Sequence, residues 1–80
     1  MKQIRKQIDI SLFLNIISKQ CSDVYYISSE GDRLNLKSEL CKYIFAIVYS
    51  KQELLLNGEL LCSKSEDYET LKDFWMEVSP

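Results

Sequence analysis

The stretch of sequence that decides the fold is DVYYISSEGDRLNLKS, residues 23–38. Its β-branched and aromatic residues at 24–27 favour a strand. Serine, glycine and acidic residues at 29–32 then form a turn cluster. Leu34 and Leu36 follow, alternating with polar neighbours as in a second strand. The sequence therefore predicts an antiparallel hairpin in this stretch.

The residues before the hairpin predict a strand followed by a helix. Residues 3–10 place Ile4, Ile8 and Ile10 in phase on an extended chain, so we expect the strand to reach Ile10. Ser11 fits a helix N-cap, and apolar residues recur after it at helical spacing. We expect the strand and the helix to meet directly.

A second helix is expected directly after the hairpin. Ser38 is its candidate N-cap. Four apolar residues follow at helical spacing, and this spacing predicts that they form the buried face. They are Leu40, Ile44, Ile47 and Val48.

The last third of the chain holds one ambiguous segment and one predicted helix. In residues 53–62 an Asn-Gly pair separates two leucine-rich runs, which fits either a small hairpin or one bent strand. Ser63 and Glu66 have the spacing of a capping box, and a helix is expected over residues 66–78. The residues expected on its apolar face are Tyr68, Leu71, Trp75 and Val78.

These elements predict an α+β fold in a single domain, residues 1–80, with the order β-α-β-β-α-β-α. Apolar residues make up 46% and charged residues 28%, a balance that favours a globular chain over a disordered one. We expect a mostly antiparallel sheet with the helices on one face, an open sandwich.

Three short motifs and the order of elements follow a known pattern. The motifs are Ser18-Lys19, Asp23-Val24 and Asn35-Leu36-Lys37-Ser38. At nearly the same spacings, with a small insertion at Gly31, they are similar to HPr, the histidine phosphocarrier family of the sugar phosphotransferase system. The resemblance covers most of the chain at low identity. It implies the HPr-like open-faced β-sandwich.

The resemblance also shows what is missing. HPr proteins carry a Gly-x-His-Ala-Arg-Pro segment between the first strand and the first helix. This chain has no such segment and no histidine. With Ile10 running into Ser11, about nine residues of the family pattern are absent. Neither Arg5 nor Arg33 is placed to replace the lost arginine, so we expect no histidine phosphotransfer.

Ser38 has two interpretations. The resemblance places Lys37-Ser38 at the family's regulatory serine, which implies phosphorylation by an HPr-kinase-like enzyme. From the residues alone, Ser38 is an N-cap that stabilises the helix by about 1 kcal/mol. Glu39 favours the cap, because its carboxylate would repel a phosphate and stands where the family has an apolar residue of its docking patch.

Aromatic residues in the second helix suggest an interaction surface. Tyr43, Phe45 and Tyr49 extend its apolar stripe beyond one narrow face. Exposed apolar surface of this kind marks interaction sites, so we expect a protein partner or a homodimer.

Several function classes have no support in the sequence. A net charge of −2 argues against nucleic-acid binding, and the longest apolar run, residues 43–49, is too short to span a bilayer. No nucleophile–base pair or glycine-rich phosphate loop points to an enzyme, a cofactor or a small-molecule substrate.

The cysteines and the acidic residues are also expected to be structural. Cys21, Cys41 and Cys62 are too widely spaced for a metal site or a disulfide framework, and they suit the reducing cytoplasm. No signal peptide is recognised. A group of carboxylates near the end is expected on a solvated helix face. Its members are Glu66, Asp67, Glu69 and Asp73.

Overall fold

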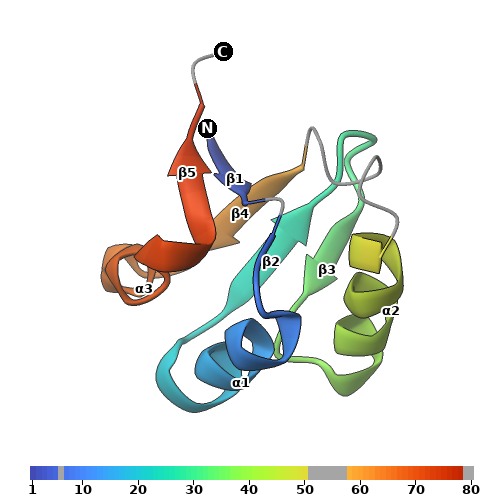
Figure 1. Ribbon diagram of the computed structural model, residues 1–80, viewed down its shortest axis with the longest axis horizontal. Coiled ribbons are helices and arrows are strands. Elements are labelled where there is room, and N and C mark those ends of the chain that lie inside the picture. Colours follow the sequence, from blue (N-terminus) through green and yellow to red (C-terminus); the bar gives the residue numbers. More distant parts are fainter. Residues whose placement is uncertain (6, 51–57, 79–80) are drawn as a thin grey trace.

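The computed structural model describes residues 1–5, 7–50 and 58–78, with the side chains of residues 48–50 outside the description. It is a mixed α+β fold with antiparallel sheets (Figure 1). The elements in chain order are β1 (Lys2–Ile4), α1 (Ile10–Gln20), β2 (Val24–Ile27), β3 (Arg33–Asn35), α2 (Glu39–Ser50), β4 (Glu59–Cys62), α3 (Ser65–Thr70), a 3-10 turn (Lys72–Phe74) and β5 (Trp75–Glu77). Within these residues, none of the helices has both the length and the hydrophobicity needed to span a bilayer.

The predicted hairpin is present, and its first strand, β2, is the central strand of a three-stranded sheet. Strand β2 pairs antiparallel with β3 on one side and with β4 on the other. In the turn between β2 and β3, the Ser28 hydroxyl accepts hydrogen bonds from the backbone N–H groups of Glu30 and Asp32. Gly31 has a φ of 92°, a conformation that suits glycine, so the turn cluster serves the role predicted for it.

Helices α1 and α2 pack on one face of this sheet. Alternation along β2 turns Val24 and Tyr26 into the core, where Leu60 of β4 lies beside Tyr26. The rings of Phe13 from α1 and Phe45 from α2 meet there, with centroids 6.0 Å apart. The side chains of β2 that point to the opposite face, Tyr25 and Ile27, are half-buried.

The expected junction between the first strand and the first helix is wrong. Strand β1 ends at Ile4, and helix α1 begins at Ile10 with Asp9, not Ser11, as its N-cap. The Asp9 carboxylate accepts the backbone N–H of Leu12 at 3.0 Å. A carboxylate is as good a cap as a hydroxyl, so the helix starts earlier than the isoleucine alternation indicated.

The long C-terminal helix is also wrong. Helix α3 ends at Thr70, the 3-10 turn follows, and Trp75 begins strand β5. Strand β5 pairs antiparallel with β1, placing Trp75 opposite Ile4, and the Trp75 indole N–H donates to the Tyr68 carbonyl. Residues 75–77, whose spacing had suggested a helix, therefore form a strand because they pair with β1. Seven elements appear in the predicted order, and β5 is added after them.

Strand β4 partly answers the question left open at residues 53–62. Residues 59–62 form one strand along β2, with Val24 opposite Cys62. The choice between a hairpin and a bent strand depends on residues 53–57, which lie outside the described residues.

Candidate interaction surface

Helix α2 begins where the sequence predicted. The Ser38 carbonyl accepts the Lys42 N–H at 2.9 Å, and its hydroxyl lies 3.5 Å from the Cys41 N–H. The second distance is long for a hydrogen bond, so the cap is weak. Ser38 itself is half-buried.

The face of α2 that enters the core is not the predicted one. Leu40 is 69% exposed, Ile47 is 62% exposed and Ile44 is 38% exposed, whereas Phe45 is fully buried. The side chain of Val48 lies outside the description. The physical reason is aromatic packing: the Phe45 ring lies 5.4 Å from the Tyr26 ring, edge to face, as well as meeting Phe13.

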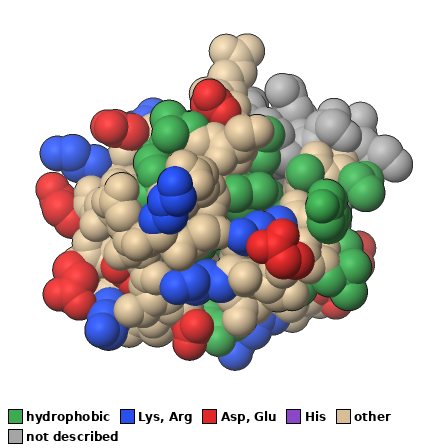
Figure 2. Space-filling view, turned by 90° about the horizontal axis from the view of Figure 1, so that it is seen from below, with side chains coloured by type: hydrophobic (Ala, Val, Ile, Leu, Met, Phe, Trp, Pro, Cys, Tyr) green, Lys and Arg blue, Asp and Glu red, His purple; other side chains and the backbone are tan. Residues whose placement is uncertain are grey.

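Because a different face of α2 enters the core, the predicted interaction residues do not all lie on the surface. Tyr43 is 69% exposed, but Phe45 is in the core and cannot belong to a surface; the side chain of Tyr49 lies outside the description. Hydrophobic side chains gather on the α2 side of the molecule, at the right of Figure 2. The exposed apolar residues of this helix are Leu40, Tyr43, Ile44 and Ile47, here named the α2 stripe.

The helical spacing of Leu40, Ile44 and Ile47 predicted a buried face, so these residues were not expected on the surface. A signal was available: no residue from 43 to 50 carries a charge. A helix that is apolar on more than one side exceeds what one core contact buries. The sequence therefore predicts surplus apolar surface on this helix, but not the side on which it lies.

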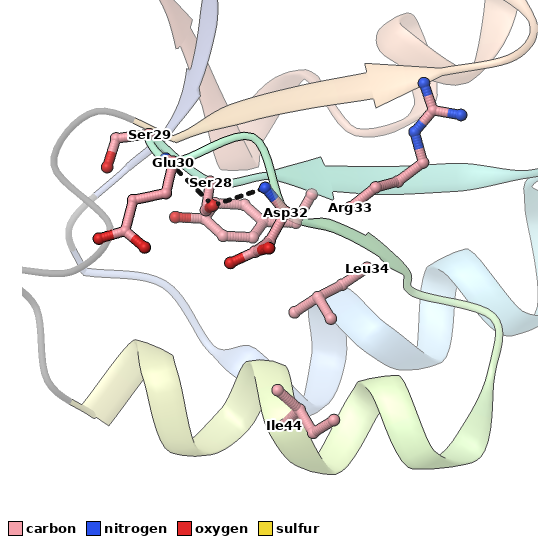
Figure 3. Close-up of a pocket in the computed structure, with 8 residues that line it drawn as sticks. Ser28, Ser29, Glu30, Asp32, Arg33, Leu34 and Ile44 are labelled. Carbon is pink, nitrogen blue, oxygen red and sulfur yellow. Dashed lines mark hydrogen bonds between the residues drawn. The ribbon is translucent and has the colours of Figure 1, made fainter.

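A pocket of about 410 Å³ opens between α2 and the β2–β3 turn, here named the hairpin pocket (Figure 3). Its apolar part comes from Tyr26, Leu34 and Ile44, and Leu34 and Ile44 face each other across it. The carboxylates of Glu30 and Asp32 lie at the end of the pocket formed by the β2–β3 turn, while the Arg33 side chain points away from the pocket. Serines 28 and 29 complete the polar rim. Ile44 thus belongs both to the pocket and to the α2 stripe.

The charges of α2 are confined to its first turn. Glu39 and Lys42 form an ion pair at 3.2 Å, and the Lys42 ammonium also contacts the Ser18 hydroxyl of α1. Lys42 is therefore held against α1. The remaining residues of the helix, 43–50, carry no charge.

The buried acid of the fold has a structural role. Asp67 is buried, unlike Glu66, Glu69 and Asp73, so the expectation of a fully solvated acidic face is wrong at this position. Its carboxylate accepts the Ser22 N–H at 2.9 Å and joins α3 to the end of α1. In the described part of the chain every buried side-chain nitrogen and oxygen has a hydrogen-bond partner. This hydrogen bond explains how the Asp67 carboxylate can be buried.

The cysteines are suited to packing. Within residues 1–5, 7–50 and 58–78, no three His, Cys, Asp or Glu side chains are grouped to hold a metal ion, and the cysteines are free thiols. Burial, reinforced by the Asp67 carboxylate, raises the pKa of Cys62 to about 12 and also raises the pKa of Cys21. Both thiols stay protonated at neutral pH, which makes them poor nucleophiles.

Thiol labelling of the native protein should follow this order. Cys41 is half-buried and should react first with a water-soluble disulfide reagent at pH 8. Cys21 and Cys62 should react at least about tenfold more slowly, because they are buried and protonated. Mass spectrometry of the labelled peptides measures each rate. In urea the three rates should converge; fast labelling of Cys62 in the native state would contradict its burial.

The chain matches no protein-family model, no curated protein and no solved structure. Its function is therefore inferred from the geometry and the sequence pattern alone.

Proposed function

We propose that this chain is a non-catalytic, HPr-like protein-interaction module that acts in the cytoplasm and docks through the α2 stripe. The observation that carries the proposal is the stripe itself. Four large apolar side chains of one helix remain exposed although the same helix already contributes Phe45 to the core. Soluble proteins rarely leave apolar side chains grouped in this way without a binding role.

The order of elements supports the HPr-like part of the proposal. The first seven elements run β-α-β-β-α-β-α, the order that the resemblance implies, and α2 starts immediately after Ser38. Strand β5 is a departure from that order.

The start of α1 supports a function without phosphotransfer. In the HPr family a phosphorylated histidine lies beside a helix N-terminus, where free N–H groups and the helix dipole favour phosphate. Here the Asp9 carboxylate occupies that end of α1 and takes the Leu12 N–H. In the sequence, residues 5–9 lie between the end of β1 and the start of α1, and they include an acid and no histidine. A negative side chain there would repel a phosphate.

Site-specific crosslinking in cells tests the docking surface. A photo-reactive amino acid placed at Leu40 or Ile47 should give a covalent protein adduct on illumination, because both side chains are exposed on the stripe. The matched control is the same amino acid at Leu12, an exposed apolar position on α1. Adducts no stronger at Leu40 and Ile47 than at Leu12 would overturn the proposed function.

Phosphorylation of Ser38 is the second candidate function. The observation that favours it is the weak cap: the Ser38 hydroxyl lies 3.5 Å from the Cys41 N–H at the start of the helix that bears the stripe. A phosphate there would add negative charge two positions before Leu40, at the N-terminal end of the stripe.

Mass spectrometry distinguishes this second candidate from a simple cap. After incubation with an HPr kinase and ATP, phosphorylation predicts a shift of one phosphate that disappears in Ser38→Ala. No shift, or a shift that persists in Ser38→Ala, would remove Ser38 as a regulatory site. The α2 stripe is unaffected by that outcome.

A further inference from the structure

The α2 stripe has a symmetric spacing. Its residues lie three, one and three positions apart, so the midpoint falls between Tyr43 and Ile44. Two copies of such a helix, packed antiparallel about a twofold axis through that midpoint, bring Leu40 next to the partner's Ile47 and Tyr43 next to the partner's Ile44. Each contact then occurs twice, which is the property of a self-complementary interface.

The hairpin pocket lies where this packing needs a cavity. It borders Ile44, the residue that would face the partner's Tyr43. Leu34 and Ile44, which face each other across it, suit an aromatic ring between them, and the carboxylates of Glu30 and Asp32 can accept a hydrogen bond from a phenol (Figure 3). A tyrosine therefore matches both the shape and the polarity of the pocket, and the volume of about 410 Å³ accommodates its ring.

We infer that a second copy of this chain occupies the α2 stripe, with Tyr43 of each copy inserted into the hairpin pocket of the other. This inference rests on the proposed function, because it names the partner of the same surface. Tyr43 is a suitable anchor: it is 69% exposed, and buried tyrosines contribute strongly at interfaces.

The charges around the stripe permit this arrangement. The charged residues of α2 are Glu39 and Lys42 in its first turn, and they are paired with each other. Antiparallel packing brings that turn against the uncharged C-terminal half of the partner helix, so the charged residues of the two α2 helices do not face each other. The opposed helix dipoles also favour the antiparallel arrangement.

The area of the stripe explains why the pocket matters. Four side chains of this size and exposure present on the order of 500 Å² per copy. Two copies would bury about 1,000 Å², which is close to the lower limit for a specific interface. Insertion of Tyr43 into the pocket adds buried area and a hydrogen bond. Both raise the affinity and the specificity of an interface that would otherwise be small.

Sedimentation equilibrium of the purified chain tests the inference. We expect a monomer–dimer equilibrium for the natural sequence. Tyr43→Ala removes the inserted ring, and Ile44→Arg fills the pocket with a side chain that can pair with Glu30 or Asp32. Each variant alone should raise the dissociation constant at least about tenfold. Leu12→Ala, at an exposed apolar position on α1, is the matched control and should leave the constant unchanged.

Mixing the two variants gives the decisive measurement. Tyr43→Ala keeps an open pocket, and Ile44→Arg keeps the tyrosine, so their heterodimer retains one of the two tyrosine–pocket contacts while neither homodimer retains any. The mixture should therefore associate more strongly than either variant alone. Circular dichroism verifies that both fold. If Ile44→Arg does not fold, Ser29→Trp on the exposed turn fills the same pocket.

Two results would overturn the inference: a monomer at every concentration, or a mixture that associates no better than its components. The crosslinking experiment separates this failure from failure of the proposed function. Adducts from Leu40 and Ile47 with twice the mass of the chain agree with a second copy. Adducts of another mass retain the docking surface but exclude self-association as its use. No adduct above the Leu12 control removes both.

Discussion

Replacing Phe45 with alanine should cost about 3–5 kcal/mol of folding free energy, the usual range for deleting a buried aromatic ring. Phe45 is fully buried and contacts the rings of both Phe13 and Tyr26, so the substitution leaves a cavity between α1, α2 and the sheet. A domain of this size has a total stability of about 4–12 kcal/mol, so much of the fold's stability depends on this one ring.

The matched control for this prediction is Tyr43→Ala, two positions away on the same helix. Tyr43 is exposed, and its loss should change the stability by no more than about 0.5 kcal/mol. Urea unfolding followed by Trp75 fluorescence, at a protein concentration low enough to keep the chain monomeric, measures both. Equal effects at the two positions would mean that α2 is rotated from the orientation described.

Replacing Gly58 with alanine should destabilise the fold by about 3 kcal/mol, the upper part of the range for overpacking a core. A Cβ at Gly58 would overlap the phenol ring of Tyr26. That ring is buried and lies against Phe45, so it cannot move aside without disturbing the core. The glycine is required by a close approach of the backbone to the ring.

The other glycine of the chain supplies the control. A Cβ at Gly31 meets nothing within 4 Å, but the positive φ of 92° makes alanine unfavourable there by about 1–2 kcal/mol. Asparagine adopts such backbone angles more readily, so Gly31→Asn should be tolerated better than Gly31→Ala. At Gly58 asparagine should be at least as harmful as alanine. Thermal unfolding of the four variants tests this pattern, and recovery by Gly58→Asn would contradict the overlap with Tyr26.

The sequence predicts those parts of the fold that depend on local chemistry. The β2–β3 hairpin follows from alternation and from the turn residues around Gly31, and the start of α2 follows from Ser38. These features are determined by neighbours along the chain, so they can be identified without knowledge of what packs against them.

The features that the sequence misses depend on distant partners. The spacing of Tyr68, Leu71 and Trp75 fits a helix, but pairing with β1 makes Trp75 the start of a strand. The candidate site shows the same limit. Helix α2 is apolar on two sides, and only its contacts with Phe13 and Tyr26 decide that Phe45 turns inward and the α2 stripe outward.

The pairing of β1 with β5 also has a consequence for how the chain folds. Lys2 and Glu77 are 75 positions apart, yet they lie opposite each other and form an ion pair. Closing so long a loop carries an entropic cost that local contacts do not, and contacts of this range slow folding. During synthesis, β1 must wait for residues 75–77 to leave the ribosome before it can pair with them. Strand β1 is made before the other strands of this fold and is thus among the last of them to find its partner.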